Sequence, residues 1–125
     1  MISGIGIDII EVARIEKQLG RVQERFLRRL FTDREIAYCS RKRFQALHFA
    51  ARFAAKEACL KAMGTGLSAG IGWKDVEILN DEAGKPSVRL GGRAKALAEE
   101  RGFRVVHVSM THVKDIAAAV VVIEK

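Results

Sequence analysis

FQALHFAARFAAKEACLKAM, residues 44–63, is the stretch that decides the fold. It is rich in alanine and contains no glycine or proline, so it predicts the clearest helix of the chain. Its apolar residues occupy more than one face, which favours a central helix over a surface helix. Gly64 suits the left-handed end of this helix, and GTGLSAGIG at residues 64–72 then predicts a flexible loop.

The elements on both sides of this helix follow from periodicity and turn residues. Residues 2–10 alternate with period two, with Ile5, Ile7 and Ile9 on one face, and predict a strand. Apolar residues three or four apart predict a helix over 11–30, which Gly20 breaks or kinks. The remaining predicted elements are a short helix over 33–43 capped by Thr32, strands at 76–79 and 87–90, a helix over 92–101, and strands at 104–110 and 116–124. This order indicates one α+β domain over residues 1–125, with a mostly antiparallel sheet packed against the long central helix.

The charge distribution indicates an anionic partner. The chain has 22 Lys and Arg against 15 Asp and Glu, a formal net charge of +7. Residues 14–43 hold ten Lys and Arg against four Asp and Glu, which is nearly the whole excess. An ordinary solubility charge is spread more evenly, so this segment points to a nucleic acid, a membrane surface, a phosphorylated ligand or an acidic protein.

Cysteine usage and hydropathy predict a cytoplasmic protein. Cys39 and Cys59 show neither a metal-ligand spacing nor a disulfide framework. The N-terminal residues MISGIGIDII lack a basic leader and are interrupted by Asp8, so we do not expect a signal peptide. No apolar run approaches the roughly 20 residues of a membrane span.

Two carboxylates, Asp8 and Glu57, have neighbours that indicate a bound ligand or cation. Asp8 shares a strand face with Gly4 and Gly6, which let a ligand or another backbone approach closely; a helix cap or turn is its alternative role. Glu57 is flanked by small and apolar residues, where a carboxylate is costly unless it is paired or binds a cation. Its alternative is an ion pair with Lys61, four residues later. Two carboxylates suit magnesium, which takes one or two protein acids besides water and phosphate oxygens.

Other polar groups are of the kinds that bind phosphate. Arg52 and Lys61 add positive charge to the central helix, and the glycine loop begins directly after it. Glycine-rich backbone binds phosphate through its N–H groups, although a plain helix-ending loop is the simpler interpretation. Ser-Met-Thr-His at 109–112 offers hydroxyls and an imidazole at a strand end, with a structural role as the alternative. We expect His48 and His107 to pack or to be partly exposed.

Three motifs occur together along this chain. They are Gly-Ile-Asp at 6–8 followed by IIEVARI, RFAAKEACLKAMGTG at 52–66, and the tetrapeptide at 109–112. In order and spacing they resemble the motifs of the holo-[acyl-carrier-protein] synthases, and the match runs from residue 4 to the end. The resemblance implies a 4′-phosphopantetheinyl transferase-like fold. This chain has Thr111 where serine is commoner, which keeps the hydroxyl, and Val113 where several relatives carry a polar residue.

The resemblance also implies an activity, a metal and site residues. It implies a magnesium-dependent enzyme that moves 4′-phosphopantetheine from coenzyme A to a serine of an acidic acyl carrier protein. The serine attacks the β-phosphate, and 3′,5′-ADP leaves. Asp8 and Glu57 would hold magnesium, Lys61 would contact the phosphates, and Glu57 would take the serine proton directly or through water, with His112 as the runner-up. The other residues implied to line the coenzyme site are Arg52, Gly64, Gly66, Ser109 and His112.

Two surfaces predict assembly and carrier binding. The resemblance implies a homotrimer with coenzyme sites between subunits, and the 44–63 helix and 116–124 strand offer more apolar surface than one chain of this length covers. On the predicted 11–30 helix, basic residues three or four apart form one stripe that would dock the acidic carrier: Arg14, Lys17, Arg21, Arg25 and Arg28. A solvated basic face is the alternative interpretation of this stripe, and a break at Gly20 would divide the stripe into two pieces.

The charge leaves two other functions to weigh. A small basic nucleic-acid-binding protein is the main alternative. Aromatic residues are only 6% of the chain and do not interleave with the basic run, so a stacking platform for bases is not expected. A structural subunit is a further alternative, but such a protein has no need for acids inside its central helix.

Overall fold

The chain forms two antiparallel sheets around one long helix. In the computed structural model, the described part is residues 1–21 and 23–125; Val22 of the predicted apolar stripe and the side chain of Arg21 lie outside it. The elements, in chain order, are strand β1 (Ile2–Glu11), helices α1 (Val12–Arg21), α2 (Gln23–Leu30), α3 (Asp33–Ser40) and α4 (Gln45–Met63), a 3-10 helix η1 (Trp73–Asp75), strands β2 (Val76–Asn80) and β3 (Pro86–Leu90), helix α5 (Gly92–Glu100), and strands β4 (Val105–Val113) and β5 (Ile116–Glu124).

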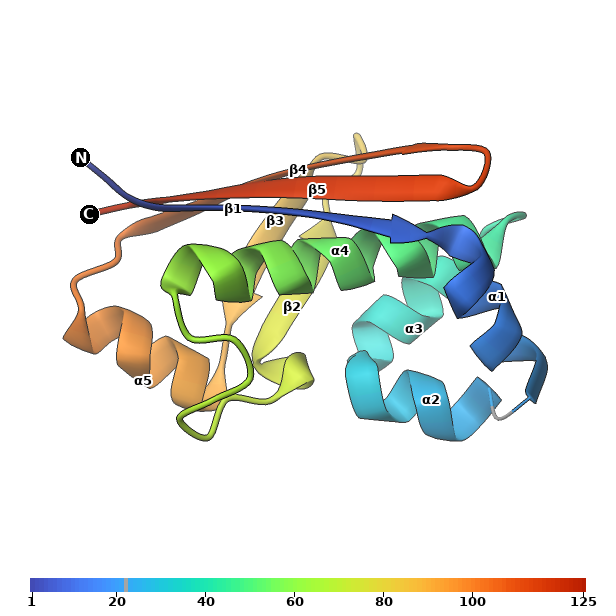
Figure 1. The fold of residues 1–125 in the computed structure, drawn as a ribbon, viewed down its shortest axis with the longest axis horizontal. Coiled ribbons are helices and arrows are strands. Elements are labelled where there is room, and N and C mark those ends of the chain that lie inside the picture. Colours follow the sequence, from blue (N-terminus) through green and yellow to red (C-terminus); the bar gives the residue numbers. More distant parts are fainter. Residues whose placement is uncertain (22) are drawn as a thin grey trace.

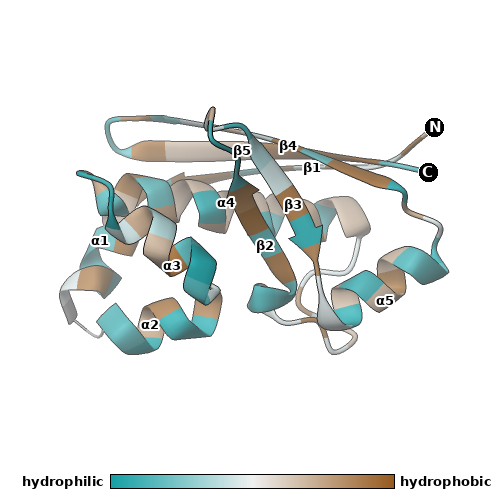
Figure 2. Cartoon of the chain, turned by 180° about the vertical axis from the view of Figure 1, so that it is seen from behind, coloured by the Kyte–Doolittle hydropathy of each residue, from teal (hydrophilic) through white to brown (hydrophobic). Residues whose placement is uncertain are grey.

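The helix α4 organises the layers. The larger sheet has the strand order β1-β5-β4, and α4 runs along one of its faces (Figure 1). The β2–β3 hairpin crosses α4 on the side that is nearer the viewer in Figure 2. Helices α1, α2 and α3 gather at one end of α4, and α5 lies at the other end with both termini (Figure 1). This arrangement confirms the predicted α+β class and the antiparallel sheet packed on a central helix.

The central position of α4 is explained by its sequence. Most of its residues are buried, on every side of the helix, including the polar side chains of Arg52 and Lys56. Small alanines at Ala50, Ala54 and Ala58 let neighbouring elements approach the helix closely, and all three are fully buried. The helix ends as predicted at Gly64, whose φ of 75° is left-handed.

Strand β1 packs on α4 through its glycines. A Cβ atom added at Gly6 would lie 1.8 Å from the carbonyl oxygen of Ala58, and one at Gly4 would lie 2.0 Å from that of Ala62. Backbone therefore touches backbone, and the glycine face of the strand points inward. As a consequence the opposite face points away from α4, with Ile5, Ile7 and Ile9 exposed by 63%, 66% and 66%.

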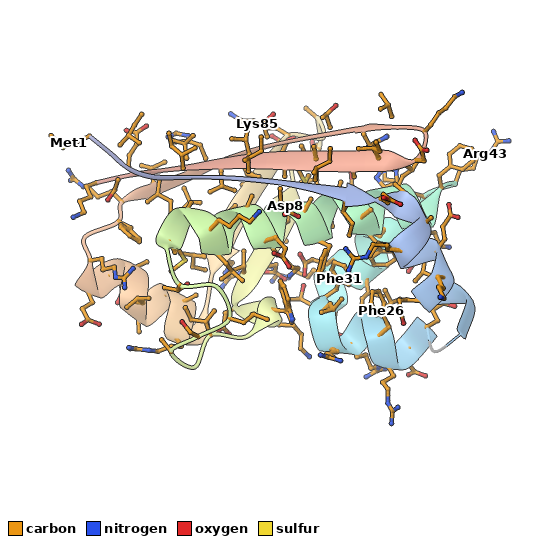
Figure 3. All side chains as sticks on the ribbon, in the orientation of Figure 1. Met1, Asp8, Phe26, Phe31, Arg43 and Lys85 are labelled. Carbon is orange, nitrogen blue, oxygen red and sulfur yellow. The ribbon has the colours of Figure 1, made fainter. Side chains whose placement is uncertain are left out.

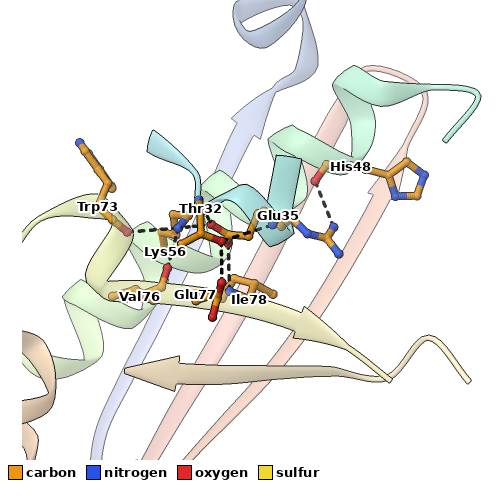
Figure 4. Close-up of polar contacts among 9 residues, drawn as sticks. Thr32, Glu35, His48, Lys56, Trp73, Val76, Glu77 and Ile78 are labelled. Carbon is orange, nitrogen blue, oxygen red and sulfur yellow. Dashed lines mark hydrogen bonds and ion pairs between the residues drawn. The ribbon is translucent and has the colours of Figure 1, made fainter. Parts of the chain in front are cut away.

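A buried ion pair fastens the elements on the other side of α4. Lys56 donates to Glu35 Oε1 at 2.8 Å, to the carbonyl oxygen of Trp73 at 3.1 Å and to that of Val76 at 2.5 Å (Figure 4). Glu35 Oε2 accepts from the backbone N–H of Ile78 at 2.9 Å. Both side chains are fully buried, and each charge is compensated by hydrogen bonds as burial requires. One pair thus joins α3, α4, η1 and β2.

The N-terminal helices differ from the prediction in two ways. Helices α1 and α2 take the place of the single helix predicted over 11–30, and Gly20 lies inside α1. The division arises because the two helices pack on different neighbours, α1 on α4 and α2 on η1, which one straight helix does not reach. Helix α3 ends at Ser40, earlier than the predicted residue 43, while its capping box between Thr32 and Glu35 confirms the predicted N-cap.

The glycine contact predicts a large effect for one added methyl group. Gly6→Ala should lower the free energy of unfolding by about 3 kcal/mol or more, because neither backbone can yield without moving β1 off α4. Thermal or urea unfolding measures this. Gly20→Ala is the matched control: a Cβ there meets no atom within 4 Å, so it should leave stability unchanged or raise it by about 1 kcal/mol. Equal stability of the two variants would contradict the contact.

Candidate functional site

Asp8, Glu57 and Lys61 meet where β1 passes over α4. Asp8 shares the inward face of β1 with the glycines, and Figure 3 places it between the strand and the helix. Lys61 Nζ donates to Asp8 Oδ1 and to the carbonyl oxygen of Ile7, each at 3.0 Å. Glu57 lies one turn before Lys61 on α4. The sequence spacing of 49 residues between the two acids did not show that they meet; the close approach of β1 and α4 brings them together.

The electrostatics of this group follow from burial and from like charge. The pKa of Glu57 is raised from its ordinary value, chiefly because the half-buried side chain loses solvent and then because the Asp8 carboxylate is near. Lys61 and Arg14 act in the opposite direction and lower the pKa of Glu57. Two carboxylates that repel each other, with two cations beside them, make a centre that gains from additional positive charge.

These residues fit a magnesium ion by the chemistry of their donors. Carboxylate oxygens are the hard ligands that magnesium prefers, and the ion commonly takes only one or two of them from protein. Within the described residues, no group of three or more His, Cys, Asp and Glu side chains is placed to hold a metal. A metal at Asp8 and Glu57 would therefore complete its coordination with water and substrate oxygens.

A pocket that no sequence pattern indicated lies next to the acids along β1 and α4, where Ile10 and Phe53 line it. It is lined by apolar side chains with two arginines and a glutamine among them: Ile10, Arg14, Ile15, Gln18, Phe26, Arg29, Leu30, Phe53 and Trp73. Phe53 and Trp73 stack in its wall with ring centroids 5.0 Å apart. Arg29 was not among the predicted site residues.

A second basic cluster lies on the opposite side of α4 from Asp8. Arg52 is 2% exposed, and its guanidinium lies 4.3 Å from the centroid of the Tyr38 ring. The guanidinium donates to the carbonyl oxygen of His48 at 3.3 Å (Figure 4) and to Asn80 Oδ1. Its Nε is buried and has no hydrogen-bond partner among the described residues. His48 in turn faces His112, with ring centroids 5.7 Å apart.

The charge of this second cluster is unbalanced. Burial lowers the pKa of His48, and the nearby Arg52, His112 and Lys42 lower it further. Burial and the neighbouring cations thus disfavour protonation of His48, and a cluster of this kind is suited to an anion. The motif resemblance implied that Arg52 and His112 line the coenzyme site, whereas His48 was expected only to pack or to be partly exposed. An isolated histidine in a helix carries no signal of its neighbours.

The third motif is divided between the two faces of the larger sheet. Ser109 and Thr111 lie on the outer face, where Ser109 pairs with Val120, which in turn pairs with Ile7. His112 faces the other way, toward His48. Strand β5 separates β4 from β1, so within one chain Ser109 does not reach Asp8.

The glycine loop begins with amides that are already bonded. The N–H of Gly64 donates to the Lys61 carbonyl oxygen at 3.0 Å, and those of Thr65 and Gly66 donate to the Leu60 carbonyl oxygen at 3.2 and 3.5 Å. These three amides end the helix, as in the simpler interpretation of the loop. Amides that bind phosphate would therefore have to come from later residues of the loop, after Gly66.

The predicted basic stripe is not one stripe. Arg14 and Lys17 lie on α1, whereas Arg25 and Arg28 lie on α2, and the side chain of Arg21 is outside the described part. Arg28 pairs with Glu24 at 3.1 Å on an exposed surface. The basic residues are therefore divided between two helices, and their role in docking the carrier stays a prediction.

Among the described residues, no helix has both the length and the hydropathy needed to cross a membrane.

Comparisons with known proteins agree with one another. The 4′-phosphopantetheinyl transferase superfamily matches residues 4–121. A holo-[acyl-carrier-protein] synthase of Geobacter sp. (strain M21) is 48% identical over 125 residues, which are 100% of both chains.

Solved structures are similar over the whole fold. The holo-[acyl-carrier-protein] synthase of Neisseria meningitidis has a TM-score of 0.91 at 35% identity and covers 100% of both chains. The Helicobacter pylori enzyme, solved in complex with coenzyme A, has a TM-score of 0.85 at 33% identity and covers 96% of this chain and 99% of that chain.

Proposed function

Since this chain belongs to the 4′-phosphopantetheinyl transferase superfamily, we propose that Asp8, Glu57 and Lys61 form its reaction centre. The chain transfers the 4′-phosphopantetheine group from coenzyme A to apo acyl carrier protein, as a holo-[acyl-carrier-protein] synthase. The observation that carries the proposed centre is the meeting of two acids and a lysine at the β1–α4 contact. Neither a nucleic-acid-binding protein nor a structural subunit has a use for this group.

The residues of the centre suit a phosphoryl transfer. The oxygen of the carrier serine bonds to the β-phosphorus of coenzyme A, the bond from that phosphorus to the bridging oxygen breaks, and 3′,5′-ADP leaves. Lys61 would stabilise the charge on the phosphate oxygens. Glu57 would accept the serine proton; its raised pKa and its place beside Lys61 support it over His112, which lies across α4.

Magnesium is part of this proposal. Asp8 and Glu57 would hold it, and their mutual repulsion and oxygen donors support the assignment. When bound, the ion would supply positive charge to the pyrophosphate of coenzyme A. Lys61 already bridges to Asp8, so it would remain at the edge of the metal site and face the substrate.

The homotrimer is supported by the uncovered face of the larger sheet. The expectation that α4 supplies exposed apolar surface was wrong, because α4 is buried within its own chain. The apolar surface comes from the outer sheet face instead, where Ile5, Ile7 and Ile9 lie beside Val120 and Val122. A face of this kind on a 125-residue chain is typical of an interface between copies.

A trimer would also bring together groups that one chain keeps apart. The acids lie on one side of α4, and Arg52 with His112 lies on the other. Coenzyme A carries a pyrophosphate and a separate 3′-phosphate, so it needs cations at two places. We place the pyrophosphate at Lys61 of one subunit and the 3′-phosphate at the Arg52–His112 cluster of its neighbour.

The carrier would dock on α1 and α2. Arg14 and Lys17 are exposed, and Arg14 lines the apolar pocket that opens beside Glu57. Arg29 lies on the rim of the same pocket, so the docking face includes a residue outside the predicted stripe. A basic rim around an apolar centre suits an acidic protein, because charge guides the encounter and apolar contact holds it.

The two cysteines support the proposed cytoplasmic location. Cys39 and Cys59 are both free and buried. Burial raises the pKa of each thiol to about 12, so neither is a reactive nucleophile or an exposed site for oxidation.

The metal assignment predicts a loss of activity without a loss of fold. Asp8→Asn and Glu57→Gln should each remove several kcal/mol of transition-state stabilisation, because each deletes a ligand charge. The measurement is the rate at which apo carrier protein gains the phosphopantetheine mass in limiting magnesium. Glu11→Gln, on the exposed part of the same strand, is the control and should keep the parent rate. Parent rates in both site variants would refute the assignment.

The shared site predicts complementation between inactive variants. Trimers of Asp8→Asn or of His112→Ala alone should transfer slowly, whereas trimers formed from equal amounts of both should regain about a quarter of the parent activity, since about one interface in four pairs two intact halves. Light scattering gives the assembly state of each sample. A fully active monomer, or mixed trimers no faster than the separate variants, would exclude a site made from two subunits.

The carrier surface predicts a salt-dependent defect. Arg14→Glu and Lys17→Glu should raise the carrier KM about tenfold at 50 mM salt and less at 300 mM, because screening weakens long-range attraction. The coenzyme A KM should hardly change for Lys17→Glu, because Lys17 is an exposed residue of α1 that lines neither the pocket nor the Asp8–Lys61 contact. Arg89→Glu on β3 loses the same charge elsewhere and serves as the control. Equal carrier KM values for parent and variants at both salt concentrations would refute carrier docking on α1 and favour a solvated basic face there.

A further inference from the structure

Helix α5 holds the glycine loop at two points. Arg101 Nη1, just after the helix, donates to the Met63 carbonyl oxygen at 2.7 Å, where the loop begins. Arg93 Nε, in the first turn, donates to the Ala69 carbonyl oxygen at 3.2 Å, near the far end of the loop. The loop and α5 lie next to each other at the end of the molecule that carries the termini (Figure 1). Two arginines from one helix therefore span residues 64–72.

The contact at Ala69 holds a backbone conformation that is unfavourable by itself. Ala69 has a φ of 59°, in the left-handed region that disfavours residues with a Cβ, and Gly70 follows with a φ of 81°. The bond from Arg93 fixes the carbonyl of the Ala69–Gly70 peptide. In a trans peptide the N–H points opposite to the C=O, so the same bond sets the direction of the Gly70 N–H.

The Gly70 amide that this contact orients is one of three free amides in the loop. The N–H groups of Gly64, Thr65 and Gly66 are bonded to α4, and those of Ser68, Ile71 and Gly72 are bonded to Thr65, Ser68 and Asp75. The N–H groups of Leu67, Ala69 and Gly70 have no partner among the described residues, and all three residues are exposed. Free amides on a turn of left-handed residues are donors for an anion. The two arginines would add positive charge at the same place.

We propose that Arg93 and Arg101 are positioning residues, which hold loop 64–72 so that its free amides bind the phosphates of coenzyme A. The inference rests on the proposed function, because it takes the coenzyme as the ligand of the loop. Neither arginine needs to touch the substrate. Their effect passes through the carbonyls of Ala69 and Met63 and should fall on coenzyme affinity, while the carrier surface on α1 and α2 is untouched.

The test combines kinetics with amide hydrogen exchange. Arg93→Ala and Arg101→Ala should each raise the coenzyme A KM about three- to tenfold, the loss expected for one typical hydrogen bond, with the carrier KM unchanged. Without coenzyme A present, the amides of residues 67–72 should exchange faster than in the parent. Lysine at either position should restore part of both properties. Lys95→Ala removes the same charge from the exposed side of α5 and should change neither.

Two results would overturn the proposal. Unchanged exchange of residues 67–72 in both alanine variants would show that the arginines do not hold the loop. A coenzyme A KM equal to that of Lys95→Ala, even with faster exchange, would show that the held loop does not serve the coenzyme. Exchange is measured without substrate, so it reports on the arginine contacts separately from transfer by the parent protein, whose absence would instead refute the proposed function.

Discussion

The contact of backbone with backbone between β1 and α4 is the constraint on which the rest of the structure depends. Gly4 and Gly6 leave no room for a side chain against the carbonyl groups of Ala62 and Ala58. Because the strand lies directly on the helix, Asp8 comes within hydrogen-bond distance of Lys61 and close enough to Glu57 to raise its pKa. The same contact turns the isoleucines of β1 outward and creates the apolar face on which the proposed trimer would assemble.

The other side of α4 is held by charge instead of by close backbone packing. The buried Glu35–Lys56 pair bonds to carbonyls and an amide of η1 and β2, so it fixes three elements against the helix at once. Burying two charges costs free energy, and removing one partner costs more because it leaves the other charge buried and unpaired. Such a pair therefore favours a single arrangement of the elements around it. Trp73, whose carbonyl is bound by Lys56, also packs on Phe53 in the wall of the pocket beside the acids.

The division of charge across α4 connects the fold with the reaction. Acids and one lysine lie toward β1, and an excess of cations lies toward α3 and β4. A substrate with two separate phosphate groups can use both, provided that two copies of the chain are placed side by side. Site and assembly then depend on the same outer sheet face, because the subunits that cover it would also complete each other's coenzyme sites.

The sequence by itself determined what local chemistry controls. Helix α4 and its end at Gly64, the capping box at Thr32, the alternation of β1 and the two hairpins were predicted because propensity, capping and period two act between near neighbours. The motif resemblance supplied the family and the pair Asp8 and Glu57. Only the tertiary structure decided that the glycine face of β1 packs inward and that α1 and α2 pack on different neighbours. It also decided that Glu35 pairs with Lys56 and that His48 lies between Arg52 and His112. These outcomes depend on which surfaces meet, and steric fit and burial between residues distant in the chain leave no periodic trace in the sequence.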